Sequence, residues 1–240
     1  MALDFGDIPV TTANQPEGTG ATFSPNFFNL GLGYSHTFEN KVSVGILFRA
    51  VSESTQELSA LGFALDAGVQ YVAGEQEEFK FGISLRNVGT PMRYSGQGLA
   101  QTAPAPDGDI DYTLTFNQRS EDFELPSVLN IGASYDINIG DMNRVTVLGN
   151  FTANSFSQDQ LGAGLEYSLN DLFQLRAAYK YEVGSENVET APIYSGLSAG
   201  ASIAAPLSKE NKNRIFGIDY AYRQTRLWDG THNISVRISL

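Results

Sequence analysis

Phe28-Asn29-Leu30-Gly31-Leu32-Gly33-Tyr34-Ser35 decides the fold class, because nearly every second residue is apolar and those between are small or polar. Successive side chains of a β-strand point to opposite faces, so this stretch forms a strand with one apolar and one polar face. The segment 173–181 alternates in the same way, and about twelve such segments follow one another along the 240 residues. The sequence therefore predicts an all-β protein built from amphipathic antiparallel strands.

The alternation sets the limits of the expected strands, and the residues between them are rich in Gly, Asn, Asp and Pro, which favour turns. The first strand is incomplete. We expect strands over about 2–10, 26–38, 42–50, 63–71, 79–85, 129–137, 145–153, 161–167, 173–181, 197–203, 216–222 and 234–240.

Composition restricts the function classes. The chain has no cysteine, which excludes disulfides and thiolate metal sites, and its net charge of −12 argues against nucleic-acid binding. Only 18% of its residues are charged, whereas soluble surfaces are about 25–35% charged. No run of about 18 apolar residues marks a transmembrane helix, but transmembrane strands hide half of their residues from lipid. An apolar face turned outward therefore fits membrane-spanning strands.

The expected joins between strands alternate in length, as in outer-membrane barrels with short periplasmic turns and long outer loops. The short joins are 39–41, 74–78, 138–143, 170–171 and 208–213, and the long ones are 11–25, 52–62, 88–125, 183–193 and 223–231. The join 155–159 is short but falls on the long side. Aromatic residues gather at both ends of the apolar face, as interfacial girdles do. We therefore expect a transmembrane, up-and-down β-barrel in a bacterial outer membrane.

The N-terminal residues indicate whether the sequence includes an export signal and the whole barrel. Met1-Ala2-Leu3-Asp4 has neither the basic start nor the apolar core of a signal peptide. We expect residues 1–240 to form a single barrel domain that lacks its N-terminal part, with 88–125 as its long outer loop. Bacterial single-chain barrels have even strand numbers, so about twelve strands, the first incomplete, suggest fourteen in the full-length protein.

Three stretches carry a family resemblance: 5–24, with Gly6 to Ser24 its most specific part, 62–68, and Arg86-Asn87-Val88-Gly89-Thr90-Pro91-Met92-Arg93-Tyr94-Ser95-Gly96. They resemble the PorV/PorQ family of outer-membrane proteins. The resemblance implies a FadL-like barrel of fourteen strands and a role in the type IX secretion system. It also implies partners: secreted cargo proteins with C-terminal signal domains, the translocon, and the surface attachment machinery. Kinship with FadL equally permits transport of small hydrophobic molecules, because fold does not determine function.

The strand alternation places charged residues of both signs on the polar face, which would line the lumen of a barrel. Charges enclosed in this way usually pair and hold the interior together, although a selectivity filter is an alternative. The candidate lumen charges are Arg49, Asp66, Arg86, Asp136, Glu166, Arg176, Lys180, Glu182, Asp219, Arg223 and Arg237.

Cofactor and catalytic motifs find little support. Asp107-Gly108-Asp109-Ile110-Asp111 begins like a calcium loop, but Tyr112 and Gln118 stand where Gly and Glu belong, so a solvated loop is the preferred interpretation. His36 and His232 lie near opposite ends of their strands on the apolar face, and no Gly-x-Ser-x-Gly elbow is present. We expect no enzyme activity, no cofactor and no metal.

The long loops are the expected contact sites, because loops on a rigid scaffold commonly carry function. The candidate partner-contact residues are Pro16, Glu17, Tyr94, Asp107, Asp109 and Trp228. Our leading hypothesis is a non-enzymatic secretion component that sits in outer-membrane lipid, binds exported cargo and passes it on. The alternative is a FadL-like channel for small hydrophobic molecules. A soluble lipocalin-like binder would need its apolar face turned inward around a very large ligand.

Overall fold

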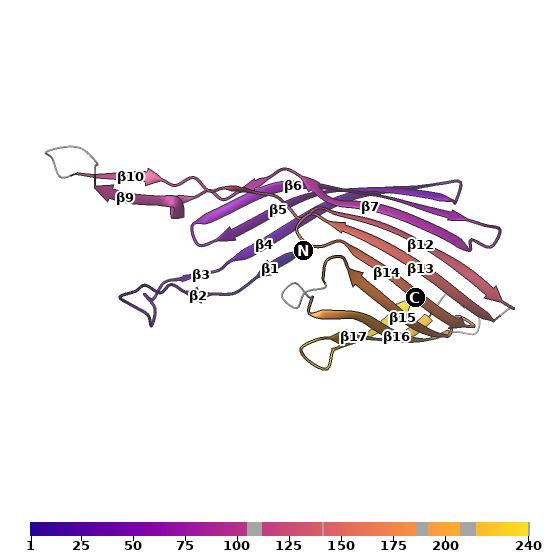
Figure 1. The fold of residues 1–240 in the computed structure, drawn as a ribbon. Coiled ribbons are helices and arrows are strands. Elements are labelled where there is room, and N and C mark those ends of the chain that lie inside the picture. The colour runs from indigo at the N-terminus through magenta and orange to yellow at the C-terminus, as the bar shows by residue number, and fades with distance from the viewer. Residues whose placement is uncertain (105–111, 141, 186–191, 207–214, 240) are drawn as a thin grey trace. The chain divides into compact units, whose positions relative to one another are not determined.

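The computed structural model describes residues 1–104, 112–140, 142–185, 192–206 and 215–239 (Figure 1). Its main element is a 12-stranded antiparallel sheet in which each strand pairs with the next main strand along the chain. The all-β class and the expected twelve strands are therefore confirmed. In order they are β1 (Ala2–Asp4), β4 (Asn26–Phe38), β5 (Val42–Thr55), β6 (Leu58–Ala73), β7 (Phe79–Gly89), β12 (Val128–Ile139), β13 (Asn143–Asn154), β14 (Gln160–Leu169), β15 (Phe173–Glu182), β16 (Tyr194–Pro206), β17 (Ile215–Thr225) and β18 (Thr231–Ser239).

The chain divides into two compact units. The first unit comprises Met1–Ser35, Gly45–Ala67 and Arg86–Pro126, and the second comprises His36–Val44, Gly68–Leu85 and Ser127–Leu240. Besides its share of the sheet, the first unit contains a short helical turn, η1 (Gln97–Leu99), and three small strand pairs. These pairs are β2 (Ile8–Pro9) with β3 (Thr22–Phe23), β8 (Met92–Arg93) with β11 (Asp122–Phe123), and β9 (Ala100–Pro104) with β10 (Thr113–Asn117).

The two faces of the sheet differ in the way the alternation predicts. In β6 of the first unit, Ala60, Gly62 and Ala64 are buried, whereas Leu61, Phe63 and Leu65 are exposed. The side chain of Leu32, on β4, is 81% exposed. An apolar face that stays uncovered along whole strands is the opposite of a soluble core.

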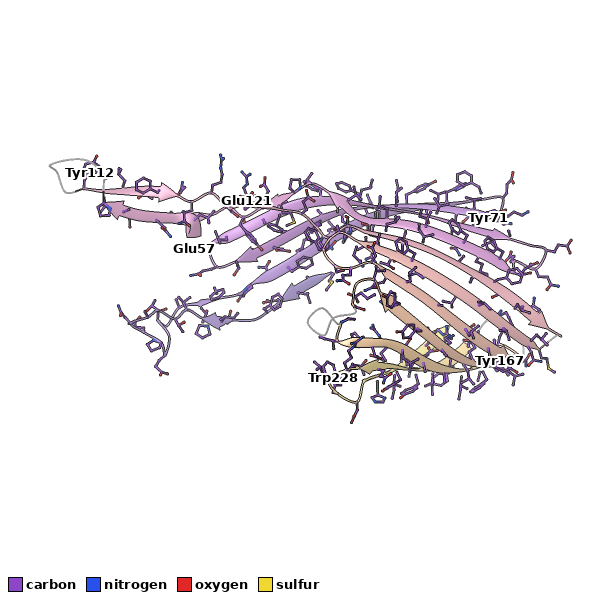
Figure 2. The ribbon with its side chains drawn as sticks, in the orientation of Figure 1. Glu57, Tyr71, Tyr112, Glu121, Tyr167 and Trp228 are labelled. Carbon is purple, nitrogen blue, oxygen red and sulfur yellow. The ribbon has the colours of Figure 1, made fainter. Side chains whose placement is uncertain are left out.

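The second unit also has an exposed apolar face, on which the strand register places apolar residues opposite one another. Val147 lies opposite Leu165, and Ile218 lies between Ile203 and Val236. All five side chains are exposed. Tyr71 and Tyr167, labelled in Figure 2, belong to this face near the short turns.

Two tight turns form where the sequence predicts them. Glu39 and Asn40 adopt φ values of 47° and 56°, and Asn170 and Asp171 adopt 53° and 54°. Two consecutive residues with positive φ make a hairpin turn whose twist matches that of the flanking strands, and Asn and Asp tolerate this conformation well. The amide of Lys41 closes the first turn onto the Phe38 carbonyl at 2.9 Å.

Two expectations about the long joins are wrong. The expected loop 52–62 is strand almost throughout, because β5 continues to Thr55 and β6 begins at Leu58, with a tight turn at Gln56 (φ 42°) between them. The polar run of Ser, Thr and Glu there marks strand ends rather than a loop. The expected first strand, 2–10, is broken at Gly6 into β1 and β2, and β2 pairs with β3 inside the expected loop 11–25.

The segment 88–125 is only partly the free loop that its glycines and prolines indicate. Pairing expected around 112–116 is confirmed, since β10 pairs with β9. Within the same segment, however, β8 and β11 pair and bury Met92 against the sheet. The acidic stretch 107–111, expected to be a solvated loop, and the expected turn 208–213 lie outside the described residues.

Candidate functional site

The polar face of the first unit carries a small apolar cluster. Met92 is fully buried against Val51 of β5 and Ala60 of β6. Val51 alternates with the exposed Phe48, so the cluster lies on the face opposite the apolar one. Further apolar side chains pack around it, namely Phe27, Tyr94, Phe123 and Leu125. Part of the expected outer loop is therefore packed onto the polar face of the sheet.

Polar contacts fix this packed segment. Arg93 donates from Nε and Nη2 to the two carboxylate oxygens of Asp122, at 2.5 and 2.8 Å. The Tyr94 hydroxyl donates to Glu53 Oε2 at 2.7 Å, and its ring stacks on Phe123 with centroids 5.2 Å apart. The hydrogen bond to the Glu53 carboxylate raises the pKa of Tyr94 to about 12, with burial as a second cause.

A second polar network lies on the same face. Arg49 Nη2 is 2.8 Å from Asp66 Oδ1, and each of these two side chains is 14% exposed. Asn87 joins them, because its backbone amide donates to Asp66 Oδ1 at 2.7 Å and its side-chain oxygen accepts from Arg49. The Asn87 amide nitrogen donates to the Pro126 carbonyl at 2.6 Å. Asn87 thereby ties the beginning of the segment 88–125 to its end.

Two carboxylates on the polar face of the second unit share one register row. Asp136, Thr146, Glu166 and Arg176 lie opposite one another along β12 to β15. Asp136 accepts from Lys80 at 2.7 Å and from Thr146 at 2.6 Å, while Glu166 accepts from Arg176 Nε at 2.6 Å. Pairing of this kind satisfies the charges locally, as expected for groups that hold a polar face together.

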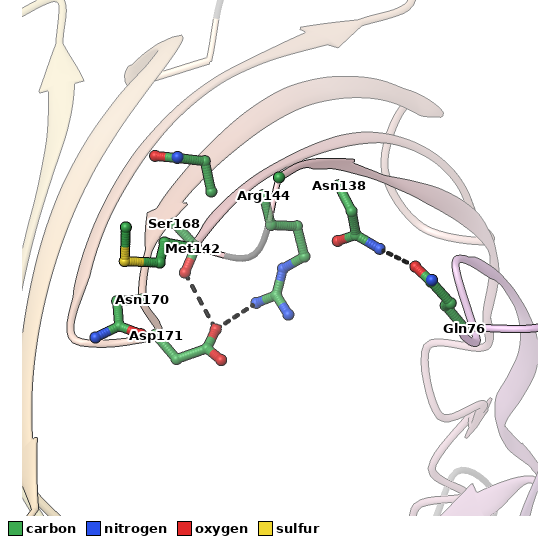
Figure 3. Close-up of a pocket in the computed structure, with 9 residues that line it drawn as sticks. Gln76, Asn138, Met142, Arg144, Ser168, Asn170 and Asp171 are labelled. Carbon is green, nitrogen blue, oxygen red and sulfur yellow. Dashed lines mark hydrogen bonds and ion pairs between the residues drawn. The ribbon is translucent and has the colours of Figure 1, made fainter.

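A polar pocket of about 520 Å³ opens near the short turns of the second unit. In Figure 3, Asp171 faces both Ser168, whose hydroxyl donates to it at 3.2 Å, and Arg144, at 3.3 Å. Asn138 donates to Gln76 at 2.8 Å across the same pocket. These groups can hydrogen-bond a polar solute or water, but they do not form an acid/base couple.

The structure brings some of the candidate polar-face charges together and leaves others apart. Arg49 pairs with Asp66 and Glu166 pairs with Arg176. Within the described residues, Arg86 and Asp219 have no ion-pair partner. The sequence does not indicate the side-chain contacts of Asn87 and Asp171 or the burial of Met92. The stretch 86–96 carries only the family resemblance and the start of a long loop, and 170–171 indicates only a tight turn.

The candidate partner-contact residues differ in exposure. Pro16 and Glu17 are exposed in the turn between β2 and β3, and Trp228 is 49% exposed. The Trp228 backbone is fixed by Thr225, whose hydroxyl donates to its carbonyl at 2.5 Å. Tyr94 is half-buried and engaged with Glu53. Asp107 and Asp109 lie outside the described residues.

The described residues contain no group of three or more His, Cys, Asp or Glu side chains that could hold a metal ion. No helix in this part of the chain is long and apolar enough to cross a bilayer.

The chain was compared with protein-family models, curated proteins and solved structures. No protein-family model and no curated protein matches the chain. Among solved structures, the chain is similar to the crystal structure of an outer membrane channel from Pseudomonas putida F1. The sequence identity is 10%, the match covers 90% of this chain and 83% of that one, and the TM-score is 0.41. A likeness at this score carries no argument about fold or function.

Proposed function

We propose that this protein spans a bacterial outer membrane as a β-barrel, with its apolar face against lipid. One observation carries the proposal: within each unit, the main-sheet strands expose a row of large apolar side chains on one face, while the charged side chains Arg49–Asp66, Lys80–Asp136 and Glu166–Arg176 pair on the other. In water such a face would be left uncovered, whereas in a bilayer it is solvated by lipid tails.

Within that setting, we propose a non-enzymatic role in protein secretion of the PorV kind, in which the chain binds exported proteins and hands them to an attachment machinery. Two features support a binding role over conduction. First, opposite charges on the polar face cancel within ion pairs, namely Arg49–Asp66, Lys80–Asp136 and Glu166–Arg176, and Met92 with its neighbours occupies part of that face. Second, the hairpin β9–β10 carries Leu114 and Phe116 exposed, outside the main sheet.

The second candidate is a FadL-like channel for small hydrophobic molecules. One observation favours it: the second unit holds a pocket of about 520 Å³ on its polar face. A channel requires this space to continue into a path through the protein. Its lining of Asn138, Arg144 and Asp171, however, suits polar solutes better than apolar ones.

Affinity purification of the tagged full-length protein from native outer membranes tests the proposals, with the untagged strain as control. We expect co-purification of secreted proteins that bear C-terminal signal domains, or of a very large translocon barrel. A lone barrel that carries only lipid or detergent overturns the secretion role. Uptake of a labelled hydrophobic compound by cells with and without the protein then decides the channel alternative. Recovery of the protein from the soluble fraction overturns the membrane assignment itself.

A further inference from the structure

A β-bulge in the second unit builds a local site on the polar face. The register of β16 against β17 shifts between Tyr194 and Ser198, so Tyr194 lies opposite Thr225 while Ser198 lies opposite Arg223. Gly196 sits in the shift with φ of 95°, and a Cβ there would overlap the Lys180 carbonyl oxygen. Only glycine fits this position. Bulges commonly re-aim side chains next to functional sites.

The bulge places the Tyr194 ring under a cation. The guanidinium carbon of Arg223 lies 3.9 Å from the centre of the ring. Stacking engages the flat face of the guanidinium and leaves the N–H groups at its edge available. No carboxylate among the described residues pairs with Arg223. Its charge is therefore oriented but not neutralised within that part of the chain.

A pocket of about 110 Å³ adjoins Arg223 and also contains Lys180, Gln160 and Glu182. Gln160 lies between the other two groups: its side-chain oxygen accepts from Lys180 Nζ at 2.9 Å, and its nitrogen donates to Glu182 at 3.4 Å. The described lining therefore holds two cations and one carboxylate, and the carboxylate is hydrogen-bonded to an amide rather than ion-paired.

We propose that this pocket binds a small oxyanion, the carboxylate or phosphate group of a water-soluble solute. The fork of Arg223 N–H groups suits two oxygens of one anion, and Lys180 supplies a second positive charge. A volume of about 110 Å³ equals that of roughly three to four water molecules, which suits a single oxyanion group. Because the pocket lies on the face opposite the exposed apolar one, the ligand arrives from water and not from lipid. The site is independent of the proposed secretion role.

Isothermal titration calorimetry on the full chain in detergent tests the site, with sodium phosphate and sodium acetate as separate probes at constant ionic strength. We expect saturable binding of at least one probe, weakened about tenfold or more by Arg223→Gln, because a charged hydrogen bond is lost. Lys180→Gln weakens it by removing the second charge. Arg226→Gln is the matched control, since this exposed arginine follows β17 but does not line the pocket.

Further variants keep the test decisive if Arg223→Gln does not fold. Tyr194→Phe retains the stacked ring and should bind like the wild type, whereas Tyr194→Ala should bind more weakly. Circular dichroism of each variant verifies that the sheet is intact. The proposal is overturned if neither probe binds saturably, or if Arg223→Gln and Lys180→Gln bind both probes as tightly as the wild type. Equal losses in Arg226→Gln overturn it as well, because they indicate only general attraction between charges.

Discussion

Met92 lies directly over Gly62 on the polar face of β6. A Cβ at position 62 would collide with Met92 Cγ and lie 3.0 Å from its sulfur, and Met92 itself is fully buried. Close approach between a long apolar side chain and a strand backbone needs the missing side chain of glycine. This contact holds the segment 88–125 against the sheet, so the packing of that segment depends on the glycine at position 62.

Gly62→Ala should therefore loosen the packed segment. We expect the free energy of unfolding to fall by about 1–3 kcal/mol, as for an overpacked core, because Met92 has to move away. Urea unfolding followed by circular dichroism measures the loss, and limited proteolysis within 88–125 locates it. Gly82→Ala is the control, because Gly82 is also on the polar face of its strand and its nearest neighbour, the Val69 carbonyl oxygen, is 3.8 Å from the added Cβ. Equal stability of the two variants would contradict the packing.

Removal of one partner of the Arg49–Asp66 pair should destabilise the first unit, because the other charge then stays in a largely buried site without a counter-ion. Asp66→Asn leaves Arg49 without a counter-ion in a site where both side chains are 14% exposed. Breaking such a pair costs about 3 kcal/mol, near the low end of the range for buried pairs. A double-mutant cycle with Arg49→Met measures the coupling, and the double variant should lose less than the sum of the single losses. Strictly additive losses would show that the two groups do not interact.

The Tyr94–Glu53 contact predicts a change at high pH. The pKa of Tyr94 is raised from 10.0 to about 12 because its hydroxyl donates to the Glu53 carboxylate. A raised folded-state pKa contributes stability that is fully present below pH 10 and is lost as the pH rises through about 12. The tyrosinate absorbance of the wild type minus that of Tyr94→Phe should therefore titrate near pH 12. Glu53→Gln should move this titration toward pH 10; an unchanged midpoint argues against the contact.

Arginine substitutions on the apolar face test which side meets lipid. Leu32 and Val147 are exposed on that face, one in each unit. Leu32→Arg and Val147→Arg should each destabilise the folded protein in lipid vesicles by roughly 2–4 kcal/mol, because both positions are expected at mid-bilayer depth. Asn117→Arg on the hairpin β9–β10 is the control and should be neutral. Unchanged stability at both apolar positions is the result that rejects the assignment of this face.

The sequence is most informative where one signal controls the structure. Alternation alone predicts β4 as 26–38, and the structure places it at Asn26–Phe38. Asn40 and Asn170 mark their tight turns because each adopts a positive φ that asparagine tolerates. These features depend on residues that are neighbours in the chain, so local physics is enough.

Features that depend on distant residues were not predicted. The end of β5 and the beginning of β6 are polar, so their sequence resembles a loop. They are strand because they contact a distant segment: Glu53 accepts a hydrogen bond from Tyr94, and Ser59 forms a β-bridge with Ser95. Nothing local in Met92 shows that it is buried against Val51, because the two are 41 positions apart (92 − 51). The pairing partners of the polar-face charges depend on strand register, and periodicity does not specify register.

Deletion of residues 101–111, which removes most of β9, tests whether the hairpin β9–β10 is needed for folding or for partner binding. Within the described residues, β9 and β10 pair only with each other, so no ladder of the main sheet is lost when residues 101–111 are deleted. The cluster around Met92 lies outside the deletion and keeps its contacts with Val51 and Ala60. We expect the deletion variant to retain the circular dichroism and urea midpoint of the wild type. Co-purification of partners from native membranes should decrease, because the exposed Leu114 and Phe116 lose their paired strand. A variant that fails to fold would show that this hairpin belongs to the core, and unchanged co-purification would exclude it as a contact surface.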